Sequence, residues 1–165
     1  MIQEFFEKKT IILGCGNPLF GDDGFGPAVI KQLENEGALP ETVAALDIGT
    51  GLKDFLFDLV LCPVKPDRIF ILDAVCRPGQ KAGKMLELNV DSFQRGRPGG
   101  GPFHQFPSLQ QLREIGSLTG VEIRILAVQA GEIPEAVRPG LSPAVQKAVL
   151  PTCEWLRKEI EGEEK

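Results

Sequence analysis

Short apolar runs of strand length alternate with helical patterns along most of this chain. The strand-like runs are residues 10–16, 43–49, 68–75 and 121–129. Such runs are typical of strands that are buried on both faces. Strands that alternate with helices pair in parallel, and the helices cover both faces of the sheet. The alternation therefore predicts an α/β fold, a three-layer α/β/α sandwich around a mostly parallel, twisted sheet of about five strands.

The remaining elements follow from helical periodicity and from residues that begin or end helices and strands. Helical patterns lie at 22–36, 51–61, 108–116 and 141–165, and an alternating edge strand lies at 84–90. Ser142 and Pro143 suit the N-cap and first position of the last helix, and Pro151 predicts a kink or break inside it. Residues 94–107 are too rich in Gly and Pro for regular structure.

Length and charge limit the classes of protein. The 165 residues predict a single domain over 1–165. A net charge of −5 argues against a nucleic-acid partner. No apolar run approaches the roughly 20 residues that span a membrane, and the N-terminus does not resemble a signal peptide. We expect a cytoplasmic protein without a membrane partner, whose four cysteines are buried free thiols because none forms a CxxC pair.

Three polar residues follow the ends of predicted strands. Asp23 comes after the first strand, Asp73 ends the third, and His104, the only histidine, lies in the glycine-rich segment. In open sheets of this kind, ligands bind outside the carboxyl ends of the strands. Each residue also has a simpler interpretation: an acidic pair caps a helix, backbone amides satisfy Asp73, and a single loop histidine usually has no special role.

The composition narrows the chemistry of such a site. The chain has no tyrosine and no GxSxG motif, so a serine nucleophile with a conventional base is not indicated. Two carboxylates and one imidazole suit a divalent cation such as zinc, nickel or manganese. The turn at 14–19 has Leu19 where a dinucleotide fingerprint needs its third glycine, which weakens a nucleotide-binding interpretation.

Four segments resemble the maturation endopeptidases of [NiFe] hydrogenases. They are ILGCGNPLFGDDGFGPAVIKQL at 12–33, ILDAV at 71–75, HQ at 104–105 and AVQAGEIPEAVRPGLSPAV at 127–145. Together they extend over nearly the whole chain. The details are most similar to the archaeal branch that serves deazaflavin-reducing hydrogenases.

The resemblance implies a metal-assisted, aspartic-type endopeptidase. Its catalytic and metal-binding trio would be Asp23, Asp73 and His104, with a possible share for Asp22. Many members of the family have a glutamate at the position of Asp23. The metal would be nickel presented by the substrate, and no tightly held organic cofactor is implied. The substrate would be the precursor of a hydrogenase large subunit, which loses a C-terminal extension.

Two alternatives stay open from the sequence. One is a non-catalytic, nickel-dependent maturation chaperone. The other is a hydrolase similar to peptidyl-tRNA hydrolases, which the acidic pair and the negative net charge disfavour. Whether the nickel is catalytic or only recognised is also open. Cys15 and Cys76 fall near the predicted site, where core thiols are the simpler interpretation.

Overall fold

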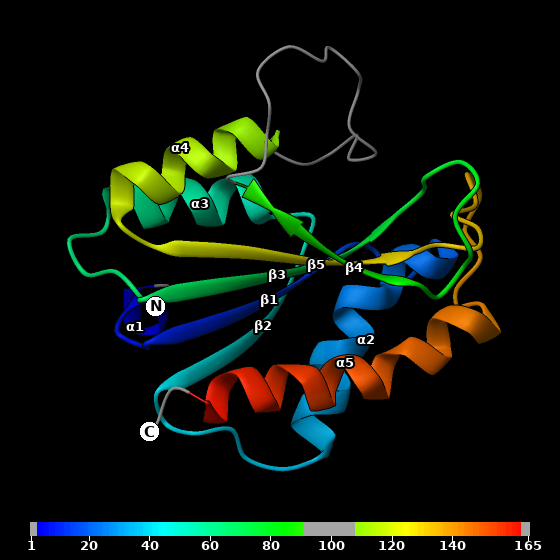
Figure 1. Ribbon diagram of the computed structural model, residues 1–165, viewed down its shortest axis with the longest axis horizontal. Coiled ribbons are helices and arrows are strands. Elements are labelled where there is room, and N and C mark those ends of the chain that lie inside the picture. The colour runs from blue at the N-terminus through cyan, green and yellow to red at the C-terminus, as the bar shows by residue number, and fades with distance from the viewer. Residues whose placement is uncertain (1–2, 91–107, 163–165) are drawn as a thin grey trace.

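The computed structural model describes residues 3–90 and 108–162, and its centre is one five-stranded sheet (Figure 1). The strand order is β2-β1-β3-β5-β4. The strands are β1 (Thr10–Cys15), β2 (Val43–Gly49), β3 (Arg68–Val75), β4 (Met85–Asn89) and β5 (Glu122–Gln129). The first, second, third and fifth pair in parallel, and β4 runs antiparallel along the edge of β5. The predicted α/β architecture is confirmed.

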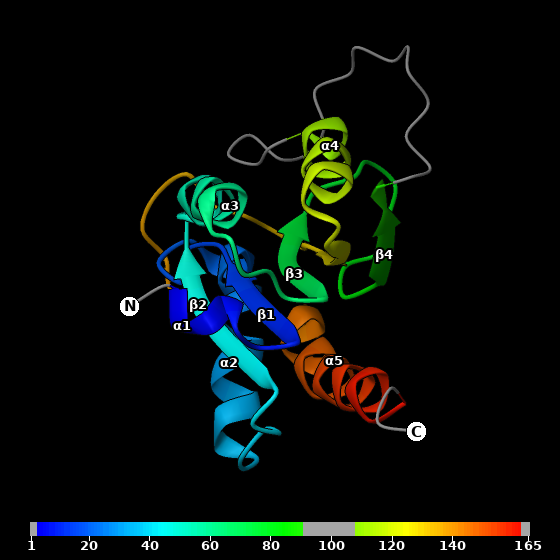
Figure 2. The same ribbon diagram turned by 90° about the vertical axis from the view of Figure 1, so that its left-hand side faces the viewer.

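Helices cover both faces of this sheet. They are α1 (Gln3–Phe6), the 3₁₀ turn η1 (Gly21–Gly24), α2 (Phe25–Asn35), α3 (Leu52–Leu61), α4 (Leu109–Thr119) and α5 (Pro143–Glu161). Figures 1 and 2 place α2 and α5 on one face, and α3 and α4 on the other.

Side chains alternate between two cores because successive residues of a strand point to opposite faces. Phe70 and Leu72 of β3 pack under α2 and α5. Ile69 and Ile71 of the same strand pack under α3 and α4. The central strands β1 and β3 are therefore buried at every position, as expected for a doubly covered sheet.

Three local features differ from the expected elements. The acidic pair lies in η1, one turn before α2, instead of inside the helix. The short helix α1 was not predicted, and its Phe6 packs against Phe55 with ring centroids 5.2 Å apart. Of the kink or break predicted at Pro151, the break is wrong, since α5 runs continuously through it, and the kink stays a prediction.

Packing explains why α5 is not broken. Pro151 is exposed, while residues on both sides of it bury an apolar stripe against the sheet and α2. That burial offsets the cost of about 3 kcal/mol that an internal proline imposes on a helix. Among the described helices, none is both long and apolar enough to cross a membrane.

Candidate active site

The carboxyl ends of β1 and β3 form the point where the sheet changes direction of winding. From β1 the chain goes to β2, which lies on one side of β1 in the sheet. The strands β3, β5 and β4 lie in that order on the other side of β1. In open parallel sheets, ligands bind in the crevice at such a switch point. Asp73 lies near the end of β3 and Asp23 follows β1, so the fold brings both predicted carboxylates to this switch point, which is called the carboxylate crevice below.

Glycines allow the turn after β1 to fold tightly against α2. Gly16 has a φ of 117°, and a Cβ atom there would lie 1.9 Å from the backbone oxygen of Asp23. A Cβ atom on Gly26 would lie 2.4 Å from the carbonyl oxygen of Cys15. Only glycine fits these close approaches. The glycine-rich sequence therefore serves to place Asp23 directly over the end of β1.

Asp23 is half-buried and partly satisfied. Its Oδ2 atom accepts a hydrogen bond of 2.8 Å from the backbone N–H of Asn17. Burial raises the pKa of this carboxyl, and the Asn17 amide partly offsets the rise. Asp23 is the N-cap residue of neither η1 nor α2, so hydrogen-bonded capping does not account for this side chain.

Asp73 is almost completely buried at the crevice. Its side chain is 4% exposed, and its Oδ1 atom is buried with no hydrogen-bond partner within the described residues. Burial raises the pKa of Asp73 well above its ordinary value, the backbone amide of Ala74 lowers it, and the negative charge of Asp23 raises it further. An unpaired, buried carboxylate oxygen beside a second carboxylate is an arrangement that a divalent cation would stabilise.

Asp22, in contrast, is fully used by the protein itself. Its Oδ2 atom accepts hydrogen bonds from the backbone of Gly131 (2.8 Å) and Glu132 (3.2 Å) and from the Ser142 hydroxyl (2.8 Å). Its Oδ1 atom accepts from the Ser142 N–H at 2.6 Å. The side chain is 1% exposed, so it does not share the ligand role left open for it. The Ser142 hydroxyl is engaged here and does not cap α5.

A second group of hydrogen bonds, besides those of Asp22, holds the segment after β3. It was not predicted from the sequence. Gln129 is buried at the end of β5; its amide accepts from the Arg77 N–H at 3.1 Å and donates to the Arg77 carbonyl at 3.2 Å. The backbone of Ala130 also donates to the carbonyl of Val75 at 2.8 Å. The signal was available in the sequence, since a glutamine ending a buried strand needs hydrogen-bond partners.

The two nearby thiols differ in environment. Cys15 is buried, and burial together with the charges of Asp73, Asp47 and Asp23 raises its pKa well above the ordinary value. Cys76 is exposed, so its interpretation as a core thiol is wrong: it lies one residue beyond β3, where the sheet no longer covers the chain. Its pKa is raised by partial burial and by Asp22 and Asp23. Neither thiol is an activated nucleophile.

His104, the third predicted ligand, lies outside the described residues. Within 3–90 and 108–162, no three His, Cys, Asp or Glu side chains converge to form a metal site. The described part of the crevice thus brings together Asp23 and Asp73, which alone are too few ligands to enclose a cation.

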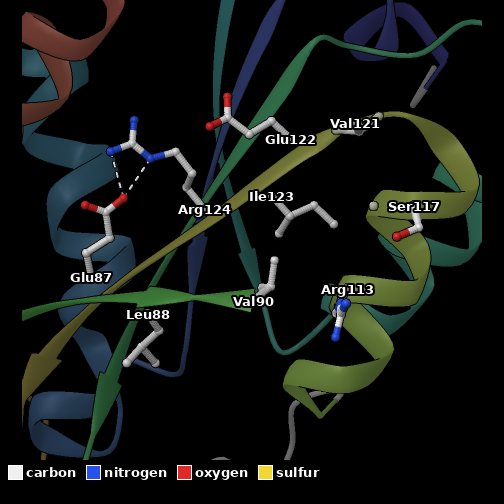
Figure 3. Close-up of a pocket in the computed structure, with 10 residues that line it drawn as sticks. Glu87, Leu88, Val90, Arg113, Ser117, Val121, Glu122, Ile123 and Arg124 are labelled. Carbon is white, nitrogen blue, oxygen red and sulfur yellow. Dashed lines mark hydrogen bonds and ion pairs between the residues drawn. The ribbon is translucent and has the colours of Figure 1, made fainter. Parts of the chain in front are cut away.

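A separate pocket of about 640 Å³ lies at the opposite end of β5 (Figure 3). Glu122, Ile123 and Arg124 at the start of that strand line it together with α4. Arg124 and Glu87 form an ion pair of 2.7 Å at its edge. Because it borders the amino end of the strand, this pocket is not part of the carboxylate crevice.

Comparison with known proteins finds a family and relatives whose names all refer to hydrogenases. The family model described as hydrogenase maturation protease matches residues 27–159. A Methanocaldococcus jannaschii protein provisionally named a hydrogenase maturation protease is 33% identical, over 93% of this chain and 97% of its own. The coenzyme F420 hydrogenase subunit delta of Methanothermobacter thermautotrophicus is 30% identical, over 94% of this chain and 96% of its own.

A solved structure supports the fold independently. The crystal structure of a [NiFe] hydrogenase maturation protease HycI from Thermococcus kodakarensis superposes with a TM-score of 0.72, covering 94% of this chain and 95% of the other. At 20% sequence identity this likeness establishes a shared fold.

Proposed function

The chain belongs to the hydrogenase maturation protease family, and from this premise we propose that it removes a C-terminal extension from the nickel-loaded large subunit of a [NiFe] hydrogenase. Membership of the family makes it an endopeptidase of hydrogenase maturation. The F420 hydrogenase relative favours a deazaflavin-reducing hydrogenase as the partner.

The observation that carries the proposal is the unsatisfied oxygen of Asp73. A buried carboxylate without a partner is costly unless a proton or a cation neutralises it. Asp23 adds a second negative charge close enough to raise the pKa of Asp73. Nickel already held by the substrate would neutralise both carboxylates, with His104 as the proposed third ligand. A bound divalent cation polarises a peptide carbonyl or activates a water, and either effect assists hydrolysis.

The number of metal ligands that the protein provides explains why processing would require nickel. Two carboxylates and one imidazole leave coordination positions that the protein does not fill. A precursor that carries nickel supplies both the metal and the remaining ligands. A nickel-free precursor lacks this contact, so it would bind weakly and escape cleavage.

Mass spectrometry of the precursor tests this function. A cognate large-subunit precursor is incubated with the protein, with and without nickel loading. We expect a C-terminal peptide to be lost from the nickel-loaded form alone. Equal cleavage of the nickel-free form would contradict the nickel requirement, and complex formation without cleavage would favour the chaperone alternative.

Matched variants test the residues. Asp23→Asn and Asp73→Asn each remove one carboxylate from the crevice, whereas Asp54→Asn removes an exposed carboxylate from α3. We expect the first two to abolish processing and the third to retain it. Processing at the wild-type rate by Asp73→Asn would refute the assignment.

A further inference from the structure

Exposed apolar side chains lie on the two loops that follow the carboxyl ends of β1 and β5. Leu19 is 48% exposed on the loop after β1, while Ile133 and Val137 are 37% and 65% exposed on the loop between β5 and α5. These three side chains are called the apolar lip below. Large exposed apolar residues that cluster next to a functional site are typical of interaction surfaces.

Backbone hydrogen bonds join the two loops that carry the lip. Arg138 N–H donates to the Leu19 carbonyl at 2.8 Å, and Gly21 N–H donates to the Arg138 carbonyl at 2.9 Å. Asp22 N–H donates to the Glu132 carbonyl at 3.3 Å. The two loops therefore form one continuous surface at the carboxyl edge of the sheet.

Asp22 closes the second loop at its base. One carboxylate accepts hydrogen bonds from Gly131 at one end of the loop and from Ser142 at the other. A loop whose ends are held together in this way is an Ω-loop, a compact and frequently functional surface element. These hydrogen bonds fix the two ends of the loop before any partner binds, which lowers the entropic cost of binding.

Two hydrogen bonds connect the lip to the proposed catalytic residue. The Leu19 N–H donates to Asn17 Oδ1 at 3.0 Å, and the Asn17 N–H donates to Asp23 Oδ2 at 2.8 Å. Leu19 is four residues from Asp23, so their Cα atoms are separated by at most about 14 Å. An extended peptide with its scissile bond at Asp23 would reach the lip within about four residues.

We propose that the apolar lip binds an apolar side chain of the precursor, about four residues from the scissile bond. This inference rests on the proposed function and adds a specificity surface to it. Arg138 and Glu132 pair with each other at 2.5 Å, and the exposed Glu135, between Ile133 and Val137, adds a negative charge that disfavours an acidic segment. An extended peptide with an apolar residue is the occupant that this surface fits.

Kinetics on the nickel-loaded precursor test the lip. The variant Leu19→Ser/Val137→Ser removes its two most exposed side chains. We expect KM to rise roughly tenfold with kcat within about twofold, because the lost contact contributes to binding rather than to the chemical step. The control Val64→Ser/Leu118→Ser removes side chains that are 46% and 72% exposed elsewhere on the surface, and it should leave KM unchanged.

The outcomes separate the inference from the function. If wild type cleaves the precursor and the lip variant keeps its KM, the lip is refuted while the function stands. The same holds if the control raises KM equally. If wild type does not cleave a verified nickel-loaded precursor, the proposed function fails and the inference fails with it.

A cross-linking experiment gives a readout independent of rate. A photoreactive residue at position 137 should capture the precursor within about six residues of the scissile bond, given the reach of an extended chain. Capture at a distant part of the precursor, or no capture from a protein that still cleaves, would overturn the proposal.

Discussion

The buried oxygen of Asp73 has a consequence for stability as well as for metal binding. Burial raises the pKa of Asp73 in the folded protein above its value in the unfolded chain. Such a group contributes stability below its unfolded pKa, and that contribution is lost as pH rises through the folded pKa. As pH rises above the unfolded pKa, ionisation of Asp73 therefore favours the unfolded chain.

The substitution Asp73→Asn tests this sign. Asparagine carries no charge at any pH, so its advantage in Tm over wild type should grow as pH increases from about 4, the ordinary aspartate pKa, toward 8. Thermal unfolding followed by circular dichroism measures the difference at each pH. The exposed Asp54→Asn variant should show no such trend. A pH-independent difference for Asp73→Asn would contradict the electrostatic explanation.

The acidic pair shows where sequence reasoning at single residues reaches its limit. Asp73 and Asp23 were identifiable because the first lies near the end of a predicted strand and the second follows one. The separate role of Asp22 was not, because its partners Gly131 and Ser142 are more than one hundred residues away. Local patterns do not contain such long-range hydrogen bonds. They also did not reveal that Cys76 is exposed.

At the scale of elements, the junction of β1 and α2 depends on close backbone contact. Gly16 and Gly37 both have positive φ, 117° and 121°. An alanine Cβ at Gly16 would clash with the Asp23 backbone, whereas nothing lies within 4 Å of one at Gly37. The pair therefore separates backbone strain from steric overlap.

We expect Gly37→Ala to cost about 1–3 kcal/mol through strain alone. Gly16→Ala should cost about 1–3 kcal/mol more through overpacking, and it should also impair processing because Asp23 is displaced. Chemical denaturation gives the free energies of unfolding, and precursor cleavage gives the activity. Equal effects of the two substitutions on both measurements would show that the close contact is unimportant.

The two prolines of α5 allow a similar comparison. Pro143 occupies the start of the helix, where its missing N–H costs little. Pro151 lies in the interior, and a residue with an N–H there restores a helical hydrogen bond. We expect Pro151→Ala to raise the free energy of unfolding by about 1–3 kcal/mol and Pro143→Ala to leave it nearly unchanged. Urea titrations measure both, and a loss of stability in Pro151→Ala would contradict this account.

Whole-molecule architecture was the most predictable level. The apolar runs of β1 and β3 have the length and composition of strands covered on both faces, and the helical patterns between strands supplied the covering layers. The continuity of α5 was not predictable, because it depends on burial against α2 and the sheet instead of on local propensity. Because the sheet has one core on each face, the cooperativity of unfolding between the two cores can be tested.

Within the described residues, the cores on the two faces are separate clusters that share the sheet, so each face should unfold with the other. Trp155, the single tryptophan, packs on the α5 face with its ring centroid 5.6 Å from that of Phe70. Leu59 is fully buried on the opposite face. Leu59→Ala should cost about 2–5 kcal/mol, and tryptophan fluorescence and circular dichroism should shift to the same lower urea midpoint. A fluorescence midpoint that stays at the wild-type value while the dichroism midpoint falls would mean that the two faces unfold separately.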